Sequence, residues 1–352
     1  MSIVEIAKLA GVSTATVSRV LNGLPGVKDA TVEQVKAVLE QTGYKPMRVH
    51  KKRKSGRRQA LRTGNIALIT LGHRSSWLLD LPVMAALVAG VQRGVTQNEL
   101  RFLLGEMPET TKMSPLLSGR QIDGAVVLVS GEVPTAEVEP ALRAMQEHAA
   151  IVRAMGADVS GGIDHVLPDN VGVGYRAFSH LAGLGCRRFA YLSAQPQWPL
   201  MRTRGQAFLN SVYDSGVKPS CYLLSTSEQV IDSYGKNVTA KADMDELVNA
   251  MLKGPDRPDG LFLPTDRITA QLYPMLAERG VRIGKDLQIV SCDNEEARLS
   301  SLNPRPASID IGAEEVGYRA VQRLLNRIDR PNGPPLTIQV AARLVTPADA
   351  AD

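Results

Sequence analysis

Several residue types are scarce in this 352-residue chain, and each scarcity argues against a class of protein. Three widely spaced cysteines offer neither a disulfide framework nor a zinc site, and the five histidines lack the spacing of metal ligands. No apolar run approaches the roughly 18 residues of a membrane span. The amino terminus has no basic region followed by an apolar one, as a signal peptide has. We therefore expect a reduced, cytoplasmic protein without membrane contact, bound metal or cofactor.

The sequence also lacks the short motifs of common enzyme classes. There is no Gly-x-Gly-x-x-Gly after an expected strand, no phosphate-cradling loop and no Gly-x-Ser-x-Gly nucleophile elbow. Asp169 and Asn170 can be mistaken for a catalytic pair, but capping of the following helix explains them better. We predict that the protein is not an enzyme.

Charge is unevenly distributed along the chain. Residues 1–62 contain thirteen lysines and arginines but four acids, a net charge of +9, whereas the whole chain has a net charge of +5 and the remainder therefore −4. A basic head on a mildly acidic body favours a polyanionic partner for the head alone, and nucleic acid is the leading candidate.

The basic head has the pattern of three short helices. Apolar residues recur at helical spacing over 3–10, and Gly11 ends this helix. A second helix is expected over 14–21, after a serine cap, and a third over 29–42. Two short helices joined by Gly-Val-Ser are typical of a helix-turn-helix, whose second helix lies in the major groove of DNA. Spacing alone also allows a plain three-helix module without a role in DNA binding.

The segment VEIAKLAGVSTATVSRVLNG at residues 4–23 closely resembles the DNA-binding head of the lactose-repressor/galactose-repressor (LacI/GalR) family. The segment GYKP at 43–46 resembles the end of that family's third helix. The resemblance implies a sequence-specific transcription regulator, and it favours a repressor over an activator. Its expected partners are a near-palindromic operator in double-stranded DNA and a second copy of the chain in a homodimer.

By this resemblance, three residues of the second helix read base edges: Thr14, Ala15 and Arg19. Arg19 can donate two hydrogen bonds to guanine, worth about 1–3 kcal/mol of discrimination. Thr14 offers a hydroxyl and a methyl group, and Ala15 offers an apolar contact. The expected contacts to the DNA backbone are Ser13, Thr16, Ser18 and Asn22. For Ser13 and Asn22, a purely local helix cap is an equally good explanation.

The linker departs from the family pattern. Family members usually continue with an asparagine and a hinge helix whose leucine enters the minor groove, but Met47 stands at the asparagine position. Residues 48–62 form a longer and more basic segment, and Leu61 fits the leucine position only in a shifted register. We expect a flexible arm that contacts phosphates, with a merely solvated linker as the alternative. The phosphate contacts expected of this arm are Lys51, Lys52, Arg53, Arg57 and Arg58.

From residue 65 the sequence alternates between strand and helix patterns. Short apolar runs are typical of buried parallel strands, and the segments between them have helical periodicity. Strands are expected at 65–71, 101–104, 124–129, 150–155, 188–193, 260–263 and 287–291. Helices are expected at 82–98, 137–148, 173–184, 268–279 and 314–328. The alternation predicts an α/β body of parallel sheets with helices on both faces, and its length favours two lobes.

Short runs in the body resemble the same family in its order and spacing: LPDN at 167–170, GCRRF at 185–189, RTRG at 202–205, TD at 265–266, SCDN at 291–294 and VGYRAV at 316–321. The resemblance implies a two-lobed type I periplasmic-binding-protein-like body in which the chain crosses between the lobes three times. The expected domains are a helix-turn-helix head at 1–46, a basic linker at 47–63, a body at 64–346 and a tail at 347–352. Lobe one is expected at about 64–166 and 296–325, and lobe two at about 167–292 and 326–346.

Relatives in this family typically bind sugars or other small metabolites between the lobes, and ligands of such sheets lie at the carboxyl ends of the strands. By resemblance, Arg202 and Asp266 are the polar residues that contact this effector. An arginine and a carboxylate suit a hydroxyl-rich or anionic molecule, although the two side chains can also simply pair with each other. The candidates for an aromatic platform are Trp77 and Trp198, which can equally be packed loop residues. Thr265 stands where the family usually has asparagine, which leaves the identity of the effector open.

Three functions remain compatible with the sequence. The first is a transcription regulator, for preference a repressor, that a small molecule in the interlobe cleft controls. The second is a constitutive DNA-binding regulator whose body only dimerises and has lost effector binding. The third, a solute-binding transport protein, is disfavoured by the fused head and by the character of the amino terminus.

Overall fold

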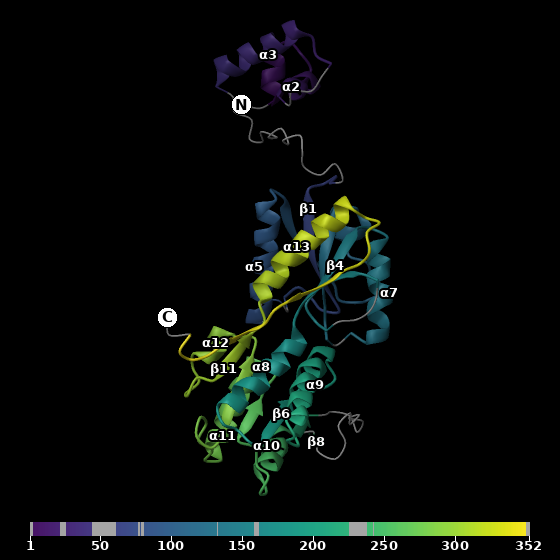
Figure 1. Ribbon diagram of the computed structural model, residues 1–352. Coiled ribbons are helices and arrows are strands. Elements are labelled where there is room, and N and C mark those ends of the chain that lie inside the picture. The colour runs from purple at the N-terminus through teal and green to yellow at the C-terminus, as the bar shows by residue number, and fades with distance from the viewer. Residues whose placement is uncertain are drawn as a thin grey trace. The chain divides into compact units, whose positions relative to one another are not determined.

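The computed structural model describes residues 3–21, 26–43, 61–76, 78, 81–131, 133–157, 162–224, 238–241 and 243–349. The chain divides into two compact units, residues 1–59 and 60–352, which we call the head and the body (Figure 1). No helix in these described ranges is long and apolar enough to cross a membrane.

The described residues of the head form the helices α1 (Ile3–Leu9), α2 (Thr14–Leu21) and α3 (Asp29–Thr42), within one residue of the expected bounds. A small core forms from the fully buried side chains of Ile6, Val17 and Val35. Gly11 and Gly43 follow α1 and α3 with φ of +61°, a left-handed conformation that glycine adopts without strain. The chain therefore turns sharply from α1 into α2, as a helix-turn-helix requires.

The described residues of the body form two sheets. The first sheet comprises β1 (Asn65–Leu71), β2 (Arg101–Met107), β3 (Gly124–Val129), β4 (Ala150–Ala154), β5 (Asp164–Pro168) and β12 (Thr337–Val340). The second comprises β6 (Phe189–Ser193), β7 (Ser220–Leu224), β8 (Val238–Lys241), β9 (Gly260–Phe262), β10 (Gln288–Cys292), β11 (Ala307–Asp310) and β13 (Arg343–Val345). The helices are α5 (Pro82–Gln97), α6 (Pro115–Ser118), α7 (Thr135–Gln146), α8 (Asn170–Gly183), α9 (Pro199–Asp214), α10 (Met244–Leu252), α11 (Asp266–Glu278), α12 (Glu296–Leu299) and α13 (Ala313–Asp329).

Both sheets are dominated by parallel strands, which confirms the predicted α/β fold class. Their orders are β12-β5-β4-β3-β1-β2 and β13-β11-β10-β9-β6-β7-β8. Neighbouring described strands are parallel throughout, except that β11 and β13 are antiparallel. Helices cover both faces of each sheet (Figure 1), with α5 and α13 opposite α7 on the first sheet and α8 and α9 opposite α10 and α11 on the second. Burial on both faces explains why a strand such as β1 is a nearly continuous apolar run.

The helices α5 and α13 approach each other so closely that their contact requires glycine. An ideal Cβ atom on Gly90 would lie 1.8 Å from the carbonyl oxygen of Glu314, and one on Gly317 would lie 2.2 Å from that of Leu87. Both obstacles are backbone atoms, so a methyl group at either position would force the helices apart. The two glycines thus fix α13 against the helix that follows the first strand.

Within the described residues, the chain crosses between the sheets three times: after β5, after β11 and after β12. The body therefore has two lobes, lobe one around the first sheet and lobe two around the second. The expected lobe boundaries are wrong at two points, because β11 belongs to lobe two and β12 to lobe one. Each of these strands has four residues, too few for an apolar periodicity to reveal it.

The body begins with a backbone anchor. The Asp123 carboxylate accepts hydrogen bonds from the amides of Arg62 (2.8 Å), Thr63 (2.8 Å) and Gly64 (2.6 Å). Leu61, directly before them, is buried with 9% exposure. This leucine is therefore packed at the start of the body rather than presented as a wedge for the minor groove.

Candidate functional site

The helix α2 of the head has one buried side and one exposed side. Val17 is fully buried, whereas Thr14, Ala15 and Arg19 are all exposed. At 100° per residue, Ala15 and Arg19 lie on the face opposite Val17, whereas Thr14 lies about 100° round the helix from Ala15, in the exposed first turn. The structure thus leaves all three expected base-reading residues accessible, with Ala15 and Arg19 on one face.

The expected backbone contacts beside α2 are described only in part. Ser13 Oγ accepts a hydrogen bond from the amide of Thr16 (3.1 Å) and lies 2.9 Å from the Thr16 hydroxyl. Ser13 is therefore a local helix cap, and Thr16 and Ser18 are partly buried at the edge of the exposed surface. The remaining expected contacts lie outside the described residues: Asn22, Lys51, Lys52, Arg53, Arg57 and Arg58.

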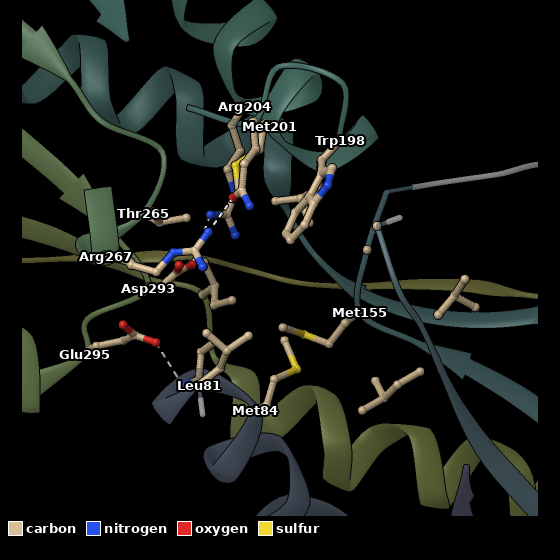
Figure 2. A pocket seen from close by; sticks show the side chains of 18 residues that line it. Leu81, Met84, Met155, Trp198, Met201, Arg204, Thr265, Arg267, Asp293 and Glu295 are labelled. Atoms are coloured by element: carbon tan, nitrogen blue, oxygen red, sulfur yellow. Dashed lines mark hydrogen bonds and ion pairs between the residues drawn. The ribbon is translucent and has the colours of Figure 1, made fainter. Parts of the chain in front are cut away.

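A pocket with a volume of about 120 Å³ lies between the two lobes of the body (Figure 2). Lobe one contributes the start of α5 and the segments after β3 and β4, and lobe two contributes the starts of α9 and α11 and the segment after β10. A cavity needs about 10–15 Å³ for each water molecule, so this one has room for several waters or a small organic molecule. Its position, at the carboxyl ends of parallel strands, is where open α/β sheets bind ligands.

A buried arginine joins three segments at the wall of the pocket. The Arg204 guanidinium, 3% exposed, donates from Nη1 to the Asp293 carboxylate (3.0 Å) and to the carbonyl oxygen of Pro264 (2.6 Å). Its Nε donates to Oδ1 of Asn170 (3.0 Å), the first residue of α8 after the first crossing between the lobes. Arg204 therefore ties the wall of lobe two to a crossing segment.

A carboxylate of lobe two reaches the other lobe beside the same pocket. Glu295 is 5% exposed, and its Oε1 accepts a hydrogen bond from the amide of Val83 in the first turn of α5 (3.2 Å), drawn as a dashed line in Figure 2. Its Oε2 pairs with Arg298 (2.5 Å). A negative charge at a helix amino terminus is stabilised by the helix dipole, so this bond favours the present arrangement of the two lobes.

Asp266 lies behind the wall rather than in the pocket. It is fully buried and accepts hydrogen bonds from the Ser308 hydroxyl (2.8 Å) and from the amide of Glu295 (2.6 Å). Burial and the nearby charge of Asp293 raise the pKa of Asp266 to about 7. Among the described residues, no group of His, Cys, Asp and Glu side chains is arranged to hold a metal ion.

Not all of the expected effector contacts line the pocket. Trp198 lines the pocket, and its indole lies against Gly131, where an ideal Cβ would come within 2.7 Å of the ring. Arg202 is exposed and outside the pocket lining, and it does not pair with the buried Asp266. Arg204, two residues along, lines the pocket in its place, because the inward stripe of α9 passes through that position. Trp77 lies outside the described residues.

Sequence reasoning missed most of the pocket lining. Arg267 lies in the first turn of α11, and its Nη2 donates to Oε1 of Gln195 (2.7 Å), a residue that follows β6. Figure 2 shows Met84 and Met155 of lobe one across the pocket from Arg267. Their places in the sequence could have identified them, since each of these residues either follows the carboxyl end of a strand or lies in the first turn of the next helix.

Comparisons with known proteins agree with this architecture at both ends of the chain. A family model described as "Bacterial regulatory proteins, lacI family" matches residues 2–47, and one described as "Periplasmic binding protein-like domain" matches residues 178–346. The head of this chain is therefore similar to bacterial regulatory proteins of the lacI family, and the second lobe and carboxyl-terminal part of the body are similar to a periplasmic-binding-protein-like domain.

Similar curated proteins span almost the whole chain. The HTH-type transcriptional repressor PurR of Mannheimia succiniciproducens is 24% identical over 98% of this chain and 97% of its own length. The HTH-type transcriptional regulator CelR of Thermobifida fusca is 25% identical over 97% of this chain and 95% of its own length. The ribose operon repressor of Haemophilus influenzae is 25% identical over 93% and 92%. These relatives are transcriptional repressors and regulators by name, and their similarity to this chain extends over both head and body.

Solved structures share the fold. A lac repressor dimer bound to operator and the anti-inducer ONPF superposes with a TM-score of 0.70 at 16% identity, covering 98% of each chain. A complex of the transcriptional regulator CelR with cellobiose gives 0.65 at 22% identity, again over 98% of each chain. At these identities the likeness shows the architecture of head and two-lobed body alone.

Proposed function

We propose that this chain is a lacI-family repressor that binds a near-palindromic operator as a two-fold dimer and is controlled by a small molecule in the interlobe pocket. The head reads the operator, the linker contacts phosphates through residues 51–58, and the body, which begins at about residue 61, dimerises and binds the effector. The observation that carries the proposal is the exposure of Thr14, Ala15 and Arg19 on α2, the last two on the face opposite the buried Val17.

Specific DNA reading follows from the chemistry of these exposed side chains. Arg19 can donate a bidentate pair to O6 and N7 of guanine, and no carboxylate of the described head residues forms an ion pair with it. Thr14 and Ala15 add methyl groups suited to contact with thymine. A dimer carries two such surfaces, so the operator should contain two half-sites about one helical turn apart, with centres roughly 34–36 Å from each other.

The basic linker adds affinity without adding sequence preference. Each phosphate that Lys51, Lys52, Arg53, Arg57 or Arg58 neutralises should steepen the log–log salt dependence of binding by roughly 0.9. Deleting residues 51–58 should therefore weaken binding and flatten the salt slope while leaving the preferred sequence unchanged. An unaltered affinity and slope would identify the linker as an inert tether.

Effector control is supported by the pocket that both lobes line and by the bond from the Val83 amide to Glu295 between them. A small molecule that binds one arrangement of the lobes better than another shifts their equilibrium by that difference in affinity. The alternative is a constitutive regulator whose body only dimerises. It predicts that no small molecule changes the thermal midpoint or the affinity for DNA.

Selection of bound duplexes from a random pool, with and without a metabolite extract, tests the DNA-binding proposal. The selected sequences should be near-palindromic, and Arg19→Ala should lose about 10- to 100-fold of the preference for one base pair in each half-site. Lys36→Ala is the control, since this exposed lysine of α3 already pairs with Glu33 (2.9 Å). The proposal fails if the full-length protein prefers no duplex at moderate salt with any of the small molecules supplied.

A further inference from the structure

The two walls of the interlobe pocket differ in chemistry. All described lining residues from lobe one are apolar or glycine: Leu81, Val83, Met84, Leu128, Val129, Gly131, Met155 and Gly156. The polar lining residues all come from lobe two: Gln195, Arg204, Thr265, Arg267, Asp293 and Glu295. Figure 2 shows this separation, with Arg267, Asp293 and Glu295 on one side and Met84 and Met155 on the other. The remaining lining residues, Trp198, Leu200, Met201 and Ile311, are also apolar, so a bound molecule meets polar side chains from lobe two alone and apolar surface elsewhere.

A hydroxyl-rich ring fits such a pocket poorly. Hydroxyl groups around a sugar point in all directions, and those facing lobe one would find no polar side chain among the described lining residues. A buried hydroxyl without a hydrogen-bond partner is unfavourable, because it has given up its bonds to water. The apolar wall instead favours a hydrocarbon or aromatic body.

The charged residues of the polar wall differ in whether they have a partner of opposite charge. Asp293 pairs with Arg204, and Glu295 pairs with Arg298 outside the lining. The guanidinium of Arg267 donates to the neutral amide oxygen of Gln195 (2.7 Å), and no carboxylate in the described part of the chain lies within ion-pair distance of it. Among the described lining residues, Arg267 is therefore the cation that has no carboxylate partner, and its guanidinium can donate to an anionic group.

Two helix amino termini add to this positive character. Arg267 lies in the first turn of α11, and Leu200 and Met201, which also line the pocket, lie in the first turn of α9. Amides of both first turns already have partners, since the Met201 amide donates to the carbonyl oxygen of Trp198 (3.0 Å) and the Ile268 amide to the Thr265 hydroxyl (3.3 Å). The contribution of each helix end is therefore its positive dipole. Both helices thus present their positive ends to the cavity that contains the Arg267 side chain.

We propose that the effector is a carboxylate with an apolar aromatic or branched aliphatic body. Its carboxylate binds Arg267, and its body packs between Trp198 and the wall formed by Met84 and Met155. A regulatory role for this ligand rests on the effector control proposed above, whereas the binding itself does not.

Titration of the full-length protein with four carboxylates tests the ligand class: benzoate, 3-phenylpropionate, indole-3-acetate and 4-methylpentanoate. Binding is followed by calorimetry and, for ligands without an indole, by tryptophan fluorescence, since Trp198 lines the pocket. The corresponding amides are uncharged ligands of the same shape, and glucose and ribose represent sugars. At least one carboxylate should bind, its amide should bind at least about tenfold more weakly, and the two sugars should bind more weakly than the amide.

Two arginine variants assign the contact. Arg267→Gln should weaken binding of the carboxylate about tenfold or more and should remove the preference for the carboxylate over its amide. Arg202→Gln is the matched control, because this arginine is exposed on α9 outside the lining, and its affinity should stay within about twofold of the wild type. Circular dichroism of both variants verifies that they are folded.

Several results would overturn the inference. These are equal binding of acid and amide, an unchanged affinity in Arg267→Gln, or no binding of any of the four acids up to about 10 mM. Binding to a selected duplex, measured on the same protein, separates this failure from that of the proposed function. If the protein prefers certain duplexes but binds none of the acids, the proposed DNA-binding function stands and the proposed ligand class is wrong. If it binds an acid but its affinity for the duplex never changes, the ligand class stands and the proposed effector control is wrong.

Discussion

Replacing Arg204 by methionine tests whether this buried arginine holds lobe two to the first crossing. Methionine keeps the length and the apolar stem of the side chain but removes the guanidinium. The Arg204 and Asp293 side chains are 3% and 9% exposed, so the variant leaves a buried carboxylate without its cation. Breaking a buried pair from one side costs about 3–5 kcal/mol, and we expect the free energy of unfolding to fall by that amount. The lower end is a minimum, because Asn170 and Pro264 also lose their donor.

Urea unfolding followed by far-ultraviolet circular dichroism measures this change, at one protein concentration because dimerisation affects apparent stability. Arg202→Met is the matched control on the same helix, and because Arg202 is exposed its effect should stay within about 0.5 kcal/mol. The double variant Arg204→Met/Asp293→Asn should recover part of the loss, since neither charge then remains. A loss below about 1 kcal/mol, or no recovery in the double variant, would refute the role given to the buried pair.

Two further predictions concern the packing and the titration of the body. Gly90→Ala should lower stability by about 1–3 kcal/mol or more in thermal unfolding, because its methyl group would lie 1.8 Å from the Glu314 carbonyl oxygen; Gly183→Ala, with nothing within 4 Å, is the neutral control. The raised pKa of Asp266, about 7, means that its stabilising contribution is complete below its usual pKa of about 4 and is lost as the pH rises through about 7. The wild type should therefore lose up to about 4 kcal/mol relative to Asp266→Asn between about pH 4 and pH 8, and a difference that is independent of pH would contradict this pKa.

The elements that sequence patterns predicted correctly are those whose buried faces are apolar. The strands β1 and β3 and the helices α2 and α3 have the expected bounds, because their buried residues are aliphatic at the expected period. The helix α9 was missed for the opposite reason. Its inward residues include Arg204, Gly205 and Ser211, which obscure an apolar stripe. These residues are stable in the interior because residues distant in sequence contact them. Such contacts cannot be inferred from the local sequence pattern.

The strand β5 illustrates the same limit. Asp164 begins it and is buried, which local hydrophobicity does not predict. Its carboxylate pairs with Arg323 (2.7 Å) and Arg327 (2.6 Å) of α13, about 160 residues away in the chain. Burial alone would raise the pKa of Asp164, but the hydrogen bonds from the two arginines and from the Leu336 amide, together with the charge of Arg323, outweigh it and lower the pKa. The strand is stable because a helix from the other end of lobe one completes it.

The sequence predicted the position of the pocket and an arginine beside it, but not which arginine of α9 lines it. The motif Arg-x-x-Gly directed attention to Arg202, and the sequence places a second arginine between that residue and Gly205. The exposed stripe of α9 contains Arg202, Gln206 and Asn210, at a spacing of four, and Arg204 falls on the buried side. To decide which of the two arginines faces the pocket, one must know how α9 is rotated about its own axis relative to the sheet. That rotation is set by tertiary contacts such as the close approach of Gly205 to the Tyr191 ring.

Control through the pocket needs more than one contact between the lobes. The bond from the Val83 amide to Glu295 is a hydrogen bond to a charged group, worth about 1.5–3 kcal/mol. Shifting a two-state equilibrium from 1:99 to 99:1 requires a ligand with about 5.5 kcal/mol of differential affinity for the two states. The bond to Glu295 is present without a ligand, so it biases the two states but adds nothing to that differential affinity.

The apolar wall of lobe one can supply this differential affinity. A ligand whose polar end is held by lobe two buries its body against Met84 and Met155 only when the lobes are close together. Burying about 100 Å² of apolar surface in that state alone contributes about 2.5 kcal/mol of preference for it. About 220 Å² of such burial would supply the full difference of about 5.5 kcal/mol, since the bond to Glu295 favours the same arrangement whether or not a ligand is bound. A ligand that is polar on all sides gains no such preference from lobe one, and the separation of apolar and polar walls is therefore what would allow this pocket to act as a switch.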